Sequence, residues 1–462
     1  MTLLWWLRHV TLPGLAMGSL LLSAYLSLWF LLARWMLPKA LAGGFWARFL
    51  SKLILASAWT FIEWARCQFT LGFPWCPLSV SQWQRPAILQ GAEWLGGWWV
   101  SFLLVFFNLC IASYLHHLLV RRLQSRRGGI LGSFCPDFYA GLLMLCVALA
   151  PFFLKTHESD SQRLLRAGFV QPYLLDKLMP GKDSIHKETL RNLTLVTSAA
   201  RPDLILWPEA STPYAITEDR AWVEAISKRT NTPMLVGAVA KSPNKDYSYN
   251  AVCLVTPEDG LDLGFYAKRV LVPFGEYVPA GLKWIPGLDK LVGPTGSFEA
   301  GGDSRLLKVD LNSTKSGVKI GSLICYEDIF PSLARRFAVD GSDFLFVCTN
   351  NAWFGEEGCA EQHAAHSVLR AIENRLPVLR CGNAGWSGWI DERGNLRATI
   401  LNEEGSVYFE GAATFEVSRQ GKSTKKLSFY TRHGDFFPYL CIAMALAGSF
   451  ILSRAKIAQR TD

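Results

Sequence analysis

Long apolar runs constrain this sequence more than any other feature. They cover residues 12–35, 47–69, 93–120, 130–154 and 436–452, and each is long enough for a helix that crosses a bilayer. Half of the 462 residues are hydrophobic and the mean hydropathy is +0.18, which is high for a soluble protein of this length. The sequence therefore predicts a transmembrane helical region over residues 1–154. It also predicts a C-terminal transmembrane helix and a basic cytoplasmic tail over residues 432–462.

Basic residues lie at the ends of these apolar runs. The net charge is +9 at pH 7, but membrane topology explains this distribution better than nucleic-acid binding does. The loop after the first run is basic, and residues 121–127, RRLQSRR, form the most basic short loop. Because basic loops stay in the cytoplasm, residues 155–431 are predicted to lie outside. The amino terminus must then start outside with no evident signal peptide, so we expect that helices are missing upstream or that the start codon is placed late.

Residues 155–431 have the composition of a globular domain. Short apolar runs occur at 203–209, 233–240, 251–257, 319–325 and 343–351, and helical patterns occur at 184–199, 218–229 and 359–375. This alternation predicts an α/β layered domain. The eleven cysteines are an odd number without a CxxC pair, which indicates neither a disulfide framework nor a zinc site.

One apolar run ends in a reactive side chain. In VKIGSLICYEDIF, residues 318–330, the run reaches Cys325 and is followed by Tyr326, Glu327 and Asp328. The run predicts a buried strand, and Asp328 is expected to cap the helix that follows. Cys325 would then stand at a strand-to-helix corner, where a thiolate can act as a nucleophile. The alternative is a free cysteine packed in the core.

Two more strand ends finish in charged residues, Glu209 in LWPEAS and Lys268 in GFYAKRVL. Reactive groups gather at the carboxyl ends of strands in α/β sheets, so Glu209, Lys268 and Cys325 are expected to meet. A thiol with an ordinary pKa of about 8.5 needs a base at neutral pH, and Glu209 is the candidate. Lys268 could stabilise an oxyanion. The alternatives are a helix-capping surface carboxylate and a solvated strand end.

The motifs follow one another in a characteristic order. They are LWPEAS, KRVLVPFGEYVP, ICYED, NNAWFGEEGCAEQH and RAIENRLPVLR. In that order they resemble the nitrilase superfamily. PFGEYVP, the Cys-Tyr-Glu triplet and the GFPW loop are similar to one branch, the apolipoprotein N-acyltransferases. The resemblance covers nearly the whole chain, and it implies a nitrilase-like αββα layered domain outside the membrane together with a membrane α-helical bundle.

The resemblance also implies a Glu-Lys-Cys triad, with Glu209 as general base, Lys268 as oxyanion stabiliser and Cys325 as nucleophile. The implied reaction moves a fatty acyl chain from a membrane phospholipid to the α-amino group of the S-diacylglyceryl-cysteine of an apolipoprotein, through a thioester on Cys325. The implied location is the bacterial inner membrane, with the catalytic domain on the periplasmic side. No cofactor, metal or nucleic-acid partner is implied.

Three further residues match supporting positions of the family. Glu276 matches a second glutamate, and it would keep Lys268 charged in a poorly hydrated pocket. A purely structural ion pair is the alternative. Tyr326 and Glu327 match the two residues after the nucleophile that the family needs. The aromatic loops around GFPW and over residues 271–288 are candidate lids or membrane anchors.

Some positions depart from the family pattern. Gln171 is present, but the Trp usual shortly after it is absent, and Asn351 stands where Asp is usual. Trp386 stands where smaller residues are common. These departures leave the triad in place and concern substrate gating and acyl-chain preference.

Two other functions remain open. One is a membrane-anchored nitrilase-type amidohydrolase that releases its acid to water, and the other is a catalytically silent nitrilase-fold module that binds lipoproteins. His363 and His366, in EQHAAH, are expected to be structural rather than metal ligands, because no suitably spaced carboxylate or Cys completes a site.

Overall fold

The computed structural model describes residues 2–41, 43–68, 73–123, 135–154, 161–175, 181–244, 247–278, 298–311, 317–420 and 427–458. The chain forms two compact units. A helical unit is drawn from residues 13–157 and 428–462, and a second unit, which contains the sheets, is drawn from residues 2–12 and 158–427.

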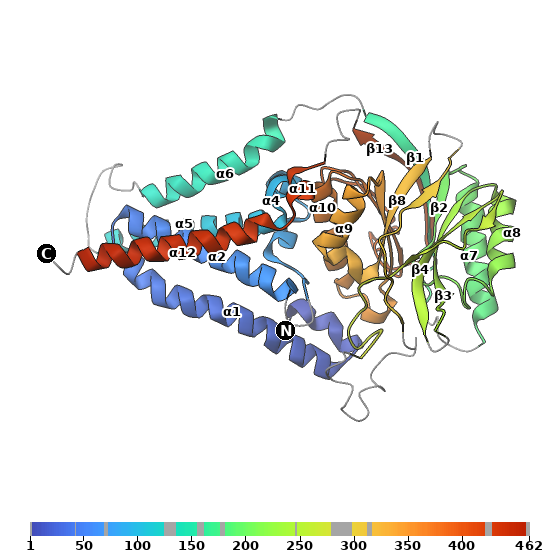
Figure 1. The fold of residues 1–462 in the computed structure, drawn as a ribbon, viewed down its shortest axis with the longest axis horizontal. Coiled ribbons are helices and arrows are strands. Elements are labelled where there is room, and N and C mark those ends of the chain that lie inside the picture. The colour runs from blue at the N-terminus through green and yellow to red at the C-terminus, as the bar shows by residue number, and fades with distance from the viewer. Residues whose placement is uncertain are drawn as a thin grey trace. The chain divides into compact units, whose positions relative to one another are not determined.

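The helical unit contains long apolar helices and several short ones (Figure 1). The long helices are α1 (Leu12–Leu41), α2 (Phe45–Gln68), α5 (Gly97–Leu123), α6 (Pro136–Leu154) and α12 (Phe436–Ala458). The short ones are η2 (Leu78–Gln82), α3 (Pro86–Leu89), α4 (Ala92–Leu95) and α11 (Phe429–His433). Within the described part of the chain, four segments are long and apolar enough to cross a membrane: Leu12–Pro38, Phe45–Gln68, Gly97–Val120 and Phe436–Arg454.

Helix boundaries differ from the predicted spans at two places. The predicted span 93–120 is interrupted at Gly96, where φ is +72° and α4 gives way to α5. Glycine adopts this conformation without strain, and a Cβ at Gly96 would lie 2.7 Å from the ring of Tyr430. The predicted span 130–154 corresponds to α6, which begins only at Pro136. Its first five predicted residues lie outside the described residues.

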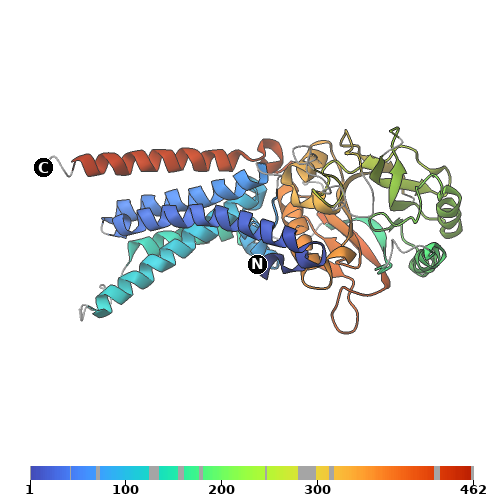
Figure 2. The same cartoon turned by 90° about the horizontal axis from the view of Figure 1, so that it is seen from below.

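Helix α2 packs along α12 and α5, and α5 along α6 (Figure 1, Figure 2). Aromatic rings fill the space between them, including Phe102 stacked on Phe106. The carboxylate of Asp435 accepts hydrogen bonds from Trp64 Nε1 at 3.1 Å and Trp98 Nε1 at 2.9 Å. The start of α12 is thereby fixed to both α2 and α5.

The second unit contains two β-sheets. The strands of the first sheet lie in the order β13 (Gly411–Gln420), β1 (Ser161–Gln171), β2 (Leu204–Leu206), β3 (Met234–Lys241), β4 (Ser248–Thr256) and β5 (Gly260–Leu261), and β6 (Tyr266–Ala267) also pairs with β4. The strands of the second lie in the order β12 (Leu396–Thr399), β11 (Gly388–Ile390), β10 (Val378–Asn383), β9 (Phe344–Asn350), β8 (Val318–Ile324) and β7 (Leu307–Val309).

Helices cover the outer faces of the two sheets (Figure 1). Helices α7 (Asp183–Ser198) and α8 (Arg220–Thr230) pack on the first sheet, and α9 (Pro331–Val339) and α10 (Cys359–Asn374) pack on the second. Between the sheets, Cys381 Sγ of β10 lies 3.3 Å from the carbonyl oxygens of Val170 and Leu206. The unit is therefore an αββα layered domain, and the predicted fold class is confirmed.

Parallel pairing determines at which edge of each sheet the strands end. Strands β1, β2 and β3 pair in parallel, as do β8, β9 and β10. Parallel neighbours end at the same edge, so the residues that follow β2 and β8 lie at the carboxyl ends of their sheets. Glu209 and Cys325 occupy those positions.

Candidate active site

Cys325 stands at a corner where the backbone is strained, and a buried carboxylate contacts the residue before it. Strand β8 ends at Ile324, and Cys325 begins the 3-10 turn η6 (Cys325–Ile329) with φ at +49°. A positive φ is uncommon for a residue with a Cβ and persists only where neighbouring contacts hold it. Glu327 Oε2 accepts a hydrogen bond from Ile324 N at 2.8 Å. The predicted strand-to-helix corner is present.

Asp328 does not cap the following helix, which corrects the sequence prediction. Helix α9 has Phe330 at its N-cap and Pro331 in its first turn. Asp328 is fully buried instead, and its carboxylate accepts hydrogen bonds from Ser367 Oγ at 2.6 Å and from Arg380. The sequence pattern favoured capping because Asp is a common N-cap residue. In the structure Asp328 instead pairs with the buried guanidinium of Arg380, which belongs to strand β10.

Lys268 lies between two carboxylates. Its Nζ is 2.8 Å from Glu276 Oε1 and 3.4 Å from Glu209 Oε1, and the lysine side chain is 1% exposed. Burial lowers the pKa of Lys268, but the charges of Glu276 and Glu209 more than offset this, so the net pKa is raised above its ordinary value. The amine is therefore held as an ammonium at neutral pH.

The two carboxylates are oriented by amide groups. Asn250 Nδ2 donates to Glu209 Oε1 at 2.7 Å and to Glu276 Oε1 at 3.3 Å. Val272 N donates to Glu276 Oε2 at 2.8 Å. Sequence reasoning missed Asn250, which is the third residue of strand β4 and is buried. A polar amide directly before the apolar run 251–255 is the signal that could have found it.

The charges of Glu209 and Lys268 act on the thiol of Cys325. Burial is the main cause that raises the pKa of its thiol to about 12, and the negative charge of Glu209 raises it further, while Lys268 lowers it. The thiol is therefore protonated at neutral pH, and a base must take its proton before the sulfur can act as a nucleophile.

Glu327 joins the lysine loop to the cysteine corner. Its carboxylate is fully buried and accepts hydrogen bonds from Tyr266 Oη at 2.9 Å and from the backbone N–H groups of Arg269 and Val270 at 2.6 Å and 3.2 Å. Together with its bond to Ile324 N, these contacts connect the segment after Lys268 with the residue before Cys325. Glu327 thus fixes the spacing between two candidate site residues.

Two further residues named from the sequence, Tyr326 and Gln171, are buried in this unit. Tyr326 is buried and its ring meets Phe330 edge to face at 5.1 Å. Gln171 Nε2 donates to the carbonyl oxygens of Val407 and Phe409. Of the two candidate lids, the second lies outside the described residues from 279 onward.

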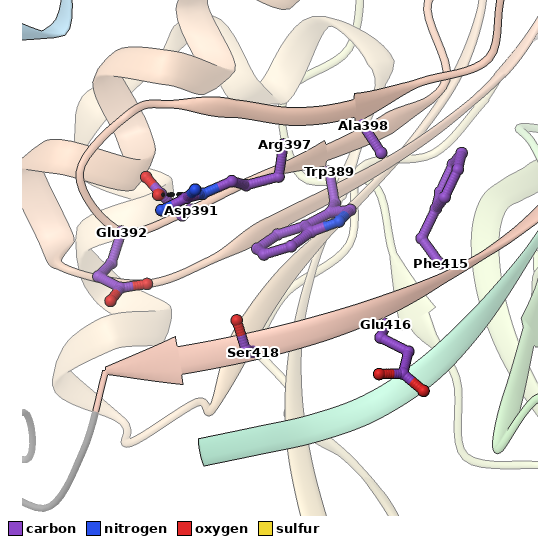
Figure 3. A pocket seen from close by; sticks show the side chains of 8 residues that line it. All are labelled: Trp389, Asp391, Glu392, Arg397, Ala398, Phe415, Glu416 and Ser418. Carbon is purple, nitrogen blue, oxygen red and sulfur yellow. Dashed lines mark hydrogen bonds and ion pairs between the residues drawn. The ribbon is translucent and has the colours of Figure 1, made fainter. Parts of the chain in front are cut away.

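A separate pocket of about 390 Å³ lies at another part of this unit (Figure 3). Its lining is formed by Trp389, Asp391, Glu392, Arg397, Ala398, Phe415, Glu416 and Ser418. Arg397 Nε donates to Asp391 Oδ2 at 2.7 Å. None of the predicted site residues lines this pocket. Within the described ranges, no group of three or more His, Cys, Asp or Glu side chains is arranged to hold a metal ion.

Residues 185–415, which lie within the αββα domain, match the Carbon-nitrogen hydrolase family model, so this domain belongs to the carbon–nitrogen hydrolase class. Residues 1–110 match the model of the Apolipoprotein N-acyltransferase N-terminal domain. The chain is a membrane protein that belongs to the apolipoprotein N-acyltransferase family, as its similarity to curated relatives also establishes.

The chain is 30% identical over 407 residues to the apolipoprotein N-acyltransferase of Geobacter metallireducens, a match that covers 86% of this chain and 73% of the relative. It is 30% identical over 430 residues to that of Chlorobaculum tepidum, covering 85% and 75%. Among solved structures, an amidase from Nesterenkonia sp. aligns with a TM-score of 0.42 at 16% identity, over 56% of this chain and 92% of the amidase.

Proposed function

We propose that this protein transfers a fatty acyl chain from a membrane phospholipid to the α-amino group of the N-terminal S-diacylglyceryl-cysteine of apolipoproteins, by a ping-pong mechanism through a thioester on Cys325. The observation that carries the proposal is the buried group of Glu209, Lys268 and Glu276, whose charges act on the Cys325 thiol. Family membership supports the choice of substrates.

In the first half-reaction, Glu209 takes the proton of the Cys325 thiol and the sulfur attacks the ester carbonyl of the phospholipid. A C–S bond forms and negative charge grows on the carbonyl oxygen. Lys268 and a backbone N–H after Cys325 stabilise that charge. The C–O bond then breaks, and the lysophospholipid alcohol leaves with the proton that Glu209 had accepted.

In the second half-reaction, the neutral α-amine of the apolipoprotein attacks the thioester carbonyl. Glu209 accepts a proton from the amine nitrogen as the C–N bond forms. Lys268 and the backbone N–H after Cys325 again stabilise the negative charge on the carbonyl oxygen. The C–S bond breaks, and the departing sulfur takes the proton back from Glu209. The amide product and the original thiol result, so no external acid or cofactor is consumed.

A membrane location favours transfer over hydrolysis. Both substrates carry lipid tails and reach the site by lateral diffusion, while an apolar setting keeps water away from the thioester. The charge distribution of the loops supports a topology in which the catalytic domain lies on the periplasmic side of the bacterial inner membrane.

The test uses the full chain reconstituted in phospholipid vesicles with a diacylglyceryl lipopeptide as acceptor. Mass spectrometry should detect an acyl thioester on the peptide that contains Cys325 when the acceptor is withheld, and an N-acylated lipopeptide when it is added. Cys325→Ala should abolish both signals, whereas Cys146→Ala, an exposed cysteine of α6, should leave them unchanged.

Two results would overturn the proposal. Release of free fatty acid in place of acylated lipopeptide would indicate an amidohydrolase-like enzyme that uses water. Tight binding of the lipopeptide without any thioester would indicate a catalytically silent binding module.

A further inference from the structure

We propose that His363 is a positioning residue for the nucleophile, because its ring holds the main-chain carbonyl of Cys325 and thereby maintains the strained corner. The inference rests on Cys325 being the nucleophile of the proposed function. His363 lies on α10, which follows Cys325 by more than thirty residues, so the contact is one that tertiary packing creates.

The imidazole makes two contacts with the corner through one nitrogen. Nε2 of His363 lies 3.0 Å from the carbonyl oxygen of Cys325 and 2.8 Å from Oδ1 of Asp328. Both of these atoms are acceptors, so Nε2 must carry the hydrogen that they share. The His363 side chain is 2% exposed, and water therefore does not compete for this hydrogen.

The other ring nitrogen faces a side-chain amide. Asn351, which follows β9, has its Nδ2 at 3.4 Å from Nδ1 of His363. This contact lies on the side of the ring opposite the Cys325 carbonyl. Asn351 thus holds the ring from the other side, while Nε2 holds the Cys325 carbonyl.

Charged and polar groups also contact Asp328 and the helix that carries His363. The carboxylate of Asp328 is already compensated by Arg380, which donates to Oδ2, while Ser367 adds a hydrogen bond. Arg370, on the same helix as His363, pairs with Glu373 at 2.9 Å. The nearby His366 is fully buried, and burial lowers its pKa well below the ordinary value, so it adds no positive charge.

The corner is therefore held from both sides. Glu327 accepts the N–H of Ile324, on the strand side of Cys325, and His363 donates to the carbonyl of Cys325 itself. Cys325 has φ at +49°, a conformation that a non-glycine residue leaves readily unless its flanking peptide groups are fixed. Loss of the His363 contact would let the backbone rotate and move the sulfur relative to Glu209 and Lys268.

The experiment compares three variants of the full chain in phospholipid vesicles. His363→Leu removes the donor, and His363→Gln keeps an N–H at a similar reach. His366→Leu is the matched control, since it replaces a buried histidine one turn along the same helix. The first-order rate of acyl-thioester formation on Cys325 is measured as a function of phospholipid concentration, together with the thermal unfolding midpoint.

His363→Leu should slow thioester formation by about 10- to 100-fold, the effect of displacing a reacting atom by an ångström or less, with little change in the half-saturating phospholipid concentration. His363→Gln should recover most of the rate, and His366→Leu should stay near the parental rate. A parental rate in His363→Leu would overturn the inference, as would equal losses of rate and unfolding midpoint in His363→Leu and His366→Leu.

If His363→Leu does not fold, the role of His363 is tested by comparing His363→Gln with the parental protein. A rate of thioester formation at or below one hundredth of the parental rate in folded His363→Gln would overturn the inference. The proposed function fails separately. Transfer that persists in Cys325→Ala would show that Cys325 is not the nucleophile. Abolished transfer in Cys325→Ala together with a parental rate in His363→Leu would contradict only the role proposed for His363.

Discussion

Nζ of Lys268 lies 2.8 Å from Oε1 of Glu276, and both side chains are buried. A lone ammonium in this setting would tend to lose its proton, because burial disfavours the charged form. The ion pair reverses that tendency and keeps the lysine available to stabilise negative charge.

Glu276→Gln should lower the rate of acyl transfer by about 10- to 100-fold, somewhat less than the loss of a whole oxyanion donor. The sign of the pH effect follows from Lys268, which must be protonated to act and whose pKa the two carboxylates raise. Removal of one carboxylate lowers that pKa, so the alkaline limb of the pH–rate profile should move to lower pH. The exposed Glu403→Gln is the control, and an unmoved alkaline limb would contradict the assignment of Lys268.

Glu209→Gln should change two properties of Cys325 in opposite directions. The charge of Glu209 raises the pKa of the thiol, so its removal should make alkylation by iodoacetamide faster at about pH 9. Thioester formation should nevertheless fall by about 100-fold or more, because the base is lost. Peptide-resolved mass spectrometry measures both. A parallel fall in alkylation and thioester formation would indicate that Glu209 acts only on the structure.

Glu327→Gln should destabilise the protein by about 1–3 kcal/mol. The carboxylate accepts hydrogen bonds from the backbone N–H groups of Arg269, Val270 and Ile324, and an amide NH₂ placed there would face donors. Chemical unfolding in detergent measures the free energy of unfolding, and thioester formation per folded molecule should fall as well, because the lysine segment and the cysteine corner are no longer tied. Unchanged stability would mean that these contacts contribute little.

Lys52→Met should destabilise the helical unit by about 3 kcal/mol, because it breaks a buried ion pair. This value is at the lower end of the range for such a loss, since Arg48 remains as a partner of Asp137. Lys52 Nζ lies 3.0 Å from Asp137 Oδ1, and both side chains are almost fully buried. The double variant Lys52→Met with Asp137→Leu should regain part of the loss, which a double-mutant cycle on thermal unfolding in detergent would detect. Strictly additive losses would argue against a direct pair.

The sequence by itself determined the features that depend on neighbouring residues. Uninterrupted apolar runs predicted the long helices, alternation of strand and helix patterns predicted the layered α/β domain, and the run ending at Cys325 predicted the corner where that residue stands. These patterns are readable because hydropathy and periodicity are local properties of the chain. The motif order also led to the family. The roles of Glu209, Lys268 and Cys325 stay predictions.

Tertiary structure alone decided which distant side chains meet. Asn250 holds both glutamates, and Asp328 binds Arg380 rather than capping a helix. A ring nitrogen of His363 lies against the carbonyl of Cys325, although the sequence indicated only a structural histidine. Each of these contacts joins segments brought together by sheet order and by helix packing on the sheets. Partners of that kind leave no periodic trace in a single sequence, because the chain between them can vary without altering the contact.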